Sequence, residues 1–352
     1  MLIEENKPLA PLTTLQVGGP ARYFCEAHSE NEIVEAANWA GERSLPLFIL
    51  GGGSNLVISD TGFNGLVLHI ALRGIEAIQS DNSSSVLFRS AAGETWDSFV
   101  QQTIEANCAG VECLAGIPGT VGGTPVQNVG AYGQEVSSVI ERVRAYDLQQ
   151  KTFKDFSAAE CNFSYRRSRF NSTDKGRYIV TRVDFLLERN AAPMLKYADL
   201  QRIFPADAHP TLKETAAAVR SIRQSKGMLL VEGDPDCRSA GSFFKNPVIP
   251  IEAIHAITEA AGKQPPGFPA SDTSHIKIPA AWLIEQAGFT KGYTCGAAGI
   301  SSRHTLALIN LGNAERSNAT AEDILTLAEK IRSAVQIKFD IQLEMEPVLL
   351  GF

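Results

Sequence analysis

Residues 30–44 carry apolar side chains at helical spacing, with Ile33, Val34 and Ala37 separated by charged or polar positions. This pattern predicts an amphipathic helix, and the apolar run LPLFIL directly after it predicts a buried strand. Further strands are expected between residues 65 and 92, followed by a helix over residues 95–108. The first part of the chain is therefore predicted to be a mixed domain that opens with a βαβ-like unit.

Helical and strand-like patterns continue to the end of the chain. Strands are expected around residues 139–147, 178–187 and 306–311, and helices over residues 210–226, 280–289 and 320–338. The last helix has an apolar residue at every third or fourth position from Ile324 to Val335. Thr320 is its expected N-cap, with Asp323 at the N3 position. The final residues, IQLEMEPVLLGF, predict a strand.

The composition is that of an ordinary globular protein, with 44% hydrophobic and 20% charged residues among 352. The net charge of −7 comes without a cluster of lysine or arginine, which argues against a nucleic-acid partner. The chain shows neither a signal-type N-terminus nor a membrane-length apolar run, so we expect a cytoplasmic protein with no membrane association. Its cysteines and histidines are dispersed, so we expect reduced thiols and no metal site.

Two glycine-rich tracts interrupt these patterns. In the first, FILGGGSNLVISD at residues 48–60, a Rossmann-type turn is excluded because Leu56 replaces the third glycine and a strand follows. A backbone that approaches a flat or anionic ligand and a tight hairpin turn remain as alternatives there. The second, GIPGTVGGTPVQNVGAYGQEV at residues 116–136, is long and almost uncharged, so it needs a partner that orders it. A dinucleotide held between the two tracts meets that need.

Six short motifs then occur in an order typical of one enzyme family. They are LGGGSNLV, AGIPGTVGGTPVQNVGAYGQEV, YRRSRF, GSFFKNP, AAWLIEQAG and LEMEP. Over almost the whole chain, the sequence resembles the UDP-N-acetylenolpyruvoylglucosamine reductases of the type I branch. The resemblance implies an α+β fold, with a two-lobed FAD-binding domain of the vanillyl-alcohol-oxidase (PCMH) type and a smaller α+β substrate-binding domain.

The resemblance also implies domain boundaries. The FAD-binding domain is expected at residues 1–205, with lobes at about 1–65 and 66–205. The substrate-binding domain is expected at residues 206–338, and residues 339–352 form a terminal strand that carries the active-site glutamate.

The activity implied by the resemblance is reduction of an enolpyruvyl ether to a lactyl ether. Non-covalent FAD takes a hydride from NADPH and passes it from N5 to the vinyl carbon of UDP-N-acetylglucosamine enolpyruvate. The product, UDP-N-acetylmuramate, serves peptidoglycan synthesis and therefore cell shape and division. A small-molecule UDP-sugar substrate and a monomer or weak oligomer are expected. Two alternatives remain: a sugar or alcohol oxidase on the same FAD fold, and a non-catalytic nucleotide-binding module.

The motifs imply three catalytic residues. Arg166 lies near the substrate carboxylate, where a guanidinium suits a planar enediolate, and Ser242 donates the proton to the α-carbon. Glu346 assists that protonation. Glu344 shares its strand face by period 2, and Pro347 stands where the family commonly has valine, so the division of roles between the two glutamates is left open.

The remaining implied site residues bind ligands. Those expected to bind the UDP-sugar are Tyr197, Arg223, Lys226, Lys245 and Asn246. Those expected to bind FAD are Gly51, Gly52, Gly53, Ser54, Asn55, Gly116, Ile117, Pro118, Gly119, Thr120, Gly122, Gly123, Gln127, Asn128, Gly130, Ala131 and Tyr132. The segment 227–237 is longer than is usual in the family, which leaves the loop after Lys226 undefined.

Overall fold

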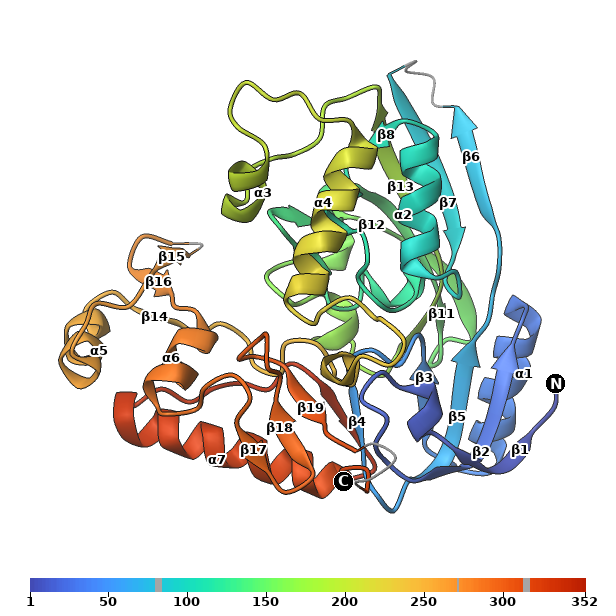
Figure 1. The fold of residues 1–352 in the computed structure, drawn as a ribbon. Helices are drawn as coiled ribbons and strands as arrows, with labels where there is room; N and C mark the ends of the chain where they lie inside the picture. The colour runs from blue at the N-terminus through green and yellow to red at the C-terminus, as the bar shows by residue number, and fades with distance from the viewer. Residues whose placement is uncertain (80–83, 271, 313–316) are drawn as a thin grey trace. The chain divides into compact units, whose positions relative to one another are not determined.

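The computed structural model describes residues 1–79, 84–270, 272–312 and 317–352. The chain divides into two compact units (Figure 1), each built from three segments. Unit 1 comprises residues 1–7, 21–53 and 64–225, and unit 2 comprises residues 8–20, 54–63 and 226–352. These units differ from the domains expected from the sequence in three segments, which are residues 8–20, 54–63 and 206–225.

The first lobe of unit 1 is a four-stranded sheet with one helix. The strand order is β1-β2-β5-β3, with β3 and β5 parallel. The strands are β1 (Glu4–Pro8), β2 (Pro20–Ala27), β3 (Leu47–Leu50) and β5 (Phe63–Ile70). Helix α1 (Glu30–Glu42) begins after Ser29, whose hydroxyl accepts the backbone N–H of Glu32. The predicted amphipathic helix and the strand after it are confirmed.

The second lobe of unit 1 is an antiparallel sheet in the order β12-β11-β13-β7-β6, with β8 added beside β13. Its strands are β6 (Ile75–Gln79), β7 (Ser85–Ala91), β8 (Cys108–Ala109), β11 (Ile140–Asp147), β12 (Thr152–Ser157) and β13 (Tyr178–Arg189). Two short strands, β9 (Gly130–Ala131) and β10 (Gln134–Glu135), pair separately. The predicted strands at 139–147 and 178–187 are confirmed.

Two helices of this lobe, α2 (Trp96–Glu105) and α4 (Leu212–Ser225), lie side by side (Figure 1). Trp96 and Phe99 of α2 pack against Phe185 of β13, with ring centroids 5.9 and 4.6 Å away. A shorter helix, α3 (Ala198–Ile203), contacts α4. The aromatic contacts make α2 a fixed part of the core of unit 1, and the glycine-rich tract follows it in the chain.

Unit 2 has a separate hydrophobic core around its longest helix, α7 (Ala321–Phe339). Its other helices are α5 (Ala253–Ala261) and α6 (Ala280–Gln286). Two antiparallel three-stranded sheets contain β14 (Val248–Pro250), β15 (Phe268–Pro269) and β16 (His275–Lys277), and β17 (Thr294–Cys295), β18 (Ala298–Ile300) and β19 (Leu308–Asn310). Helix α7 (Ala321–Phe339) begins with a capping box between Thr320 and Asp323, as predicted.

The terminal strand begins later than its pattern predicts. Strand β20 (Val348–Leu350) pairs in parallel with β4 (Leu56–Ile58). Residues 341–347 contain only one isolated bridge, between Met345 and Phe244. The expected alternation holds as far as Glu344, which is exposed, but Glu346 is half-buried. No helix in the described residues is long and apolar enough to cross a membrane.

Candidate functional site

The two glycine tracts contact each other within unit 1. A Cβ atom added to Gly52 would lie 2.6 Å from the Cα of Gly119, and one added to Gly51 would lie 2.8 Å from the Oγ1 of Thr120. Real Cβ atoms essentially never approach other atoms this closely. Glycine is therefore required in the first tract, because the two backbones pass within van der Waals contact of each other.

Backbone hydrogen bonds fix the second tract to the loop between β7 and α2. The N–H groups of Val121 and Gly122 donate to the carbonyls of Glu94 and Ala92, and the carbonyl of Gly119 accepts the N–H of Trp96 at 3.0 Å. A Cβ on Gly122 would lie 2.6 Å from the Cβ of Ala92, so this glycine is needed for close packing on that loop. A Cβ on Gly123 would meet no atom within 4 Å, so the tract has an open side there.

Three residues of this region that are not glycine adopt left-handed backbone conformations. They are Asn128, Tyr132 and Arg166, with φ of 44°, 50° and 55°. Such conformations are costly for ordinary residues and occur preferentially at functional sites. The buried Asn128 amide donates to Glu135 and to the carbonyl of Ser164, and it accepts the N–H of Ser137. Its side chain therefore joins the second tract to the residue that directly precedes the YRRSRF motif.

The YRRSRF motif is held against the second tract. Arg166 Nη2 donates to the carbonyl of Gly130 at 2.8 Å, and the guanidinium lies 5.4 Å from the centre of the Tyr165 ring. The hydroxyl of Ser168 donates to the carbonyl of Val126 at 2.7 Å. These contacts fix the Arg166 guanidinium beside the second tract in unit 1.

Arg223 lies inside unit 1. Its side chain is 7% exposed, and its Nε donates to the carbonyl of Gly116 at 3.0 Å. Burial lowers the pKa of Arg223 below its ordinary value, and the neighbouring Tyr132 opposes that shift. Tyr132 in turn packs edge-on against Tyr197, with ring centroids 5.3 Å apart. Arg223 and Tyr197 thus both contact Tyr132 of the second tract, whereas Lys226 follows the last residue of α4.

The main-chain segments that carry Ser242 and Glu346 are joined within unit 2. The antiparallel bridge between Phe244 and Met345 includes a hydrogen bond from the N–H of Glu346 to the carbonyl of Phe243 at 2.9 Å. Glu346 therefore lies beside the residue that follows Ser242. Both side chains are half-buried, and no hydrogen bond from the Ser242 hydroxyl is found among the described residues.

The two residues after this bridge are held by other groups of unit 2. Lys245 Nζ lies 2.5 Å from Glu344 Oε1, an ion pair in which the glutamate is largely exposed. The side-chain oxygen of Asn246 accepts the N–H of Ala280 at 2.9 Å, at the start of α6. Glu344 is thus paired with Lys245, whereas the N–H of Glu346 bonds to the residue that follows Ser242.

The first tract also leads into this part of unit 2. Asn55 Nδ2 donates to the carbonyl of Glu346 at 3.3 Å, and the carbonyl of Asn55 accepts the N–H of Val348 at 2.9 Å. Parallel pairing of β4 and β20 continues from there. Asn55 therefore fixes the main chain on both sides of Pro347, the position at which the sequence departs from the family pattern.

The long segment 227–237 folds around Arg303, a residue that the sequence analysis did not single out. Arg303 pairs with Asp234, and its Nε donates to Asp236 at 2.7 Å. Asp236 also accepts the N–H and the hydroxyl of Ser302. The extra residues are therefore tied by two carboxylates into a defined loop, and only the pair of aspartates in GDPDC hints at it in the sequence.

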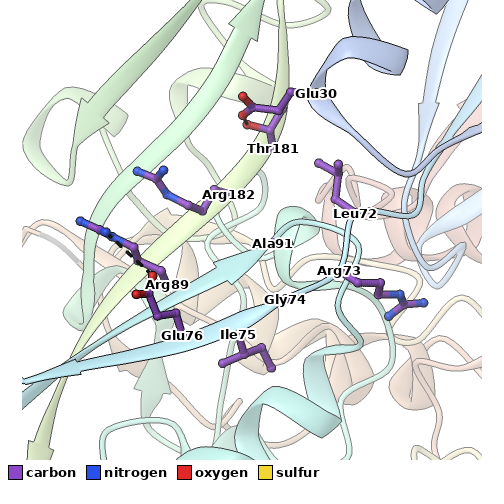
Figure 2. Close-up of a pocket in the computed structure, with 10 residues that line it drawn as sticks. All are labelled: Glu30, Leu72, Arg73, Gly74, Ile75, Glu76, Arg89, Ala91, Thr181 and Arg182. Carbon is purple, nitrogen blue, oxygen red and sulfur yellow. Dashed lines mark hydrogen bonds and ion pairs between the residues drawn. The ribbon is translucent and has the colours of Figure 1, made fainter.

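One cavity of about 430 Å³ in unit 1 contains none of the predicted site residues (Figure 2). Its lining combines Arg89, facing Glu76 at 4.0 Å, with Glu30, whose carboxylate accepts the Thr181 hydroxyl at 2.7 Å. The other charged side chains of its lining are paired with residues outside it: Glu30 with Arg144, Arg73 with Glu94 and Arg182 with Asp184. Among the described residues, no group of three or more His, Cys, Asp or Glu side chains could hold a metal ion.

Two protein-family models match this chain, one in its N-terminal part and one in its C-terminal part. A family model described as "UDP-N-acetylenolpyruvoylglucosamine reductase, C-terminal domain" matches residues 234–350, and one described as "FAD binding domain" matches residues 21–152. The second match, residues 21–152, contains both glycine tracts completely. The contact between Gly52 and Gly119 and the open side at Gly123 fit a cofactor held along these backbones.

Relatives match over nearly the full length. The chain is 47% identical to the UDP-N-acetylenolpyruvoylglucosamine reductase of Streptomyces coelicolor, covering 98% of this chain and 90% of the relative. It is 43% identical to that of Thermobifida fusca, covering 98% and 97%. The crystal structure of the Thermus caldophilus reductase aligns over all of both chains with a TM-score of 0.67 and 26% identity. The chain therefore belongs to the UDP-N-acetylenolpyruvoylglucosamine reductase family of FAD-dependent oxidoreductases.

Proposed function

We propose that this protein reduces UDP-N-acetylglucosamine enolpyruvate to UDP-N-acetylmuramate with NADPH, as a cytoplasmic step of peptidoglycan synthesis. FAD, when bound, supplies the hydride chemistry by accepting a hydride from NADPH and donating it to the vinyl carbon. The observation that supports the proposal is the backbone bridge that joins the segments carrying Ser242 and Glu346 in unit 2. A module that only stores a nucleotide has no need of a hydroxyl and a carboxylate held in this way.

The residues of the chain then have distinct tasks. Hydride addition at the vinyl end leaves electron density on the substrate carboxylate, as an enediolate, and Arg166 stabilises that charge. The Ser242 hydroxyl gives its proton to the α-carbon, which completes the lactyl ether and leaves a serine alkoxide. Glu346 assists by restoring the proton to Ser242 from solvent. Serine is a weak acid, so this transfer depends on the strong basicity of the enediolate carbon.

Substrate binding is divided among the other predicted residues. Tyr197 is 41% exposed and packs on Tyr132, an arrangement suited to a lid over the diphosphate. Lys226 and Lys245 supply cations for the phosphates. Arg223 and Asn246 act indirectly, because Arg223 holds the second tract and Asn246 holds the start of α6.

The test separates the two half-reactions. In Ser242→Ala, NADPH should bleach the flavin at a near-normal rate, because that step involves no α-carbon. Reoxidation by the enolpyruvyl substrate should slow by ~10² to 10⁴, the usual cost of losing a positioned acid. Anaerobic stopped-flow absorbance at the flavin band measures both rates, and Ser242→Cys should restore part of the second. Equal slowing of both rates would show that Ser242 only supports the local structure.

The same instrument distinguishes the oxidase alternative. An oxidase reoxidises its flavin with molecular oxygen and has no use for NADPH. Reduced enzyme mixed with air-saturated buffer should therefore reoxidise far more slowly than reduced enzyme mixed with the enolpyruvyl substrate. Rapid reoxidation by oxygen, with no response to the enolpyruvyl substrate, would favour the oxidase.

A further inference from the structure

The peptide groups around Gly116, at the start of the second tract, are held by polar side chains from two helices. The N–H of Gly116 donates to Asp97 Oδ1 at 2.6 Å, and its carbonyl accepts the Nε of Arg223 at 3.0 Å. Asp97 belongs to α2 and Arg223 to α4. Gly116 is buried and has φ of 74°, a conformation that only glycine adopts at little cost.

The second oxygen of Asp97 is used as well. Arg220 Nη1 donates to Asp97 Oδ2 at 2.6 Å, so the carboxylate bridges the tract and α4. The side chains of Asp97 and Arg220 are 41% and 33% exposed, whereas the peptide that they hold is buried. Hydrogen bonds from a charged acceptor to a buried N–H are among the stronger ones in proteins, and an unsatisfied buried N–H is costly.

The hydrogen bond between Asp97 and Gly116 lies at the start of the second tract, close to its contact with the first tract. Three residues after Gly116, the backbone reaches Gly119, which touches Gly52 of the first tract. Downstream, the tract is held by main-chain bonds at Gly119, Val121 and Gly122. At its start, the side chains of Asp97 and Arg223 hold it. A change at Asp97 therefore alters where the second tract begins while the downstream anchors persist.

We propose that Asp97 is a positioning residue for the FAD site, and that Arg220 acts on the cofactor through Asp97. This rests on the proposed role of the two tracts as the FAD cradle. Asp97 orients the Gly116 peptide without being required to touch the cofactor. A carboxylate on the first turn of a helix is ordinary, since it also favours the helix N-terminus, so the sequence offered no signal for this role.

Affinity for FAD tests the proposal directly. Apoprotein is titrated with FAD, and the dissociation constant is measured by flavin fluorescence. Asp97→Ala removes both bonds and should raise that constant about ten- to a hundredfold, the range expected for loss of a charge-assisted hydrogen bond. Asp97→Asn keeps an acceptor for Gly116 and should raise it less. Glu105→Ala, at an exposed position on the same helix, should leave it unchanged.

A double-mutant cycle tests the route from Arg220. Arg220→Gln should weaken FAD binding in the wild-type background and have little further effect in Asp97→Asn. Equal effects in both backgrounds would overturn the proposed route. If Asp97→Ala fails to fold, Asp97→Asn and Arg220→Gln still decide the question.

Two further outcomes distinguish the positioning role of Asp97 from the FAD cradle itself. A lower melting temperature of the Asp97→Ala apoprotein with an unchanged FAD dissociation constant would show a purely structural role, and it would overturn the proposal. Gly52→Ala serves as the reference for the cradle itself. If Gly52→Ala weakens FAD binding and the Asp97 variants do not, the positioning role fails and the cradle stands. If neither affects FAD binding, the cradle fails, and the positioning role fails with it.

Discussion

Gly52→Ala tests the contact between the two glycine tracts with a single added carbon. The new Cβ would lie 2.6 Å from the Cα of Gly119 and 2.9 Å from its carbonyl carbon. Ordinary van der Waals contact begins near 3.4 Å, so the two backbones have to separate by several tenths of an ångström. Gly119 has little freedom to move, because its carbonyl is bonded to Trp96 and the next residue forms a bridge with Thr95.

The size of the effect follows from this overlap. Overpacking by one carbon in a well-fixed region costs about 1–3 kcal/mol. If the first tract moves and the cost appears in cofactor binding, the FAD dissociation constant should rise roughly five- to 150-fold. Titration of the apoprotein with FAD measures this change, and thermal unfolding of the apoprotein measures the cost to the fold.

Gly41→Ala is the matched control. Gly41 lies within α1, and a Cβ there would meet no atom within 4 Å. Because alanine is the better helix former, this variant should be as stable as the wild type or up to about 1 kcal/mol more stable, with FAD affinity unchanged. An unchanged FAD affinity in Gly52→Ala as well would refute the reasoning, since the close approach would then have no bearing on the cofactor.

Two other predictions concern residues that hold main chain in place. Asn246→Ala should lower the free energy of unfolding by about 1 kcal/mol, because the first N–H of α6 loses its acceptor; Asn246→Asp should restore it in denaturation experiments, and no loss in Asn246→Ala would contradict the capping role. Asp147 is fully buried and paired with Arg177 and Lys154, and the Arg177 hydrogen bond is the main cause that holds its pKa well below the ordinary value of 3.8. Because folding lowers the pKa of Asp147, its carboxylate stabilises the fold at pH values above its unfolded-state pKa, and this contribution is lost as the pH falls. Asp147→Asn should therefore be destabilised on the order of 3 kcal/mol at pH 7, with a smaller difference from the wild type at pH 3. Urea unfolding at both pH values measures this, and a difference independent of pH would count against the ion pairs.

Features specified by neighbouring residues were predicted well from the sequence. Helix α7 is an example, because its cap at Thr320 and the spacing of its apolar residues lie within a few positions of each other. The terminal strand was placed too early, since its true boundary depends on pairing with β4, almost the whole chain away. Alternation between polar and apolar residues continues before the strand because Leu343 is packed in the core of unit 2, not because it belongs to a ladder.

In the candidate site, the bonding partners of side chains could not be predicted from the sequence when those partners lie far away along the chain. Arg223 and Asn246 were expected to bind the UDP-sugar, because their side-chain types suit phosphate contacts. Their observed partners are backbone groups 107 and 34 positions away along the chain. A residue's type restricts which groups it can bond, but the fold decides which of those groups lies beside it. Asp97 was overlooked for this reason, because its partner Gly116 is on a different element.

The interleaving of the two units has a consequence for how the protein is made. Segments 8–20 and 54–63 are synthesised early, yet Leu15, Val17 and Val57 belong to the core of unit 2. Strand β4 gains its partner only when β20, nearly 300 residues later, has been synthesised and has left the ribosome. Neither unit corresponds to a continuous stretch of sequence, so a fragment that starts at residue 226 lacks part of its own core. Completion of unit 2 during synthesis therefore waits for residues 348–350, and its early segments expose apolar side chains to chaperones until then.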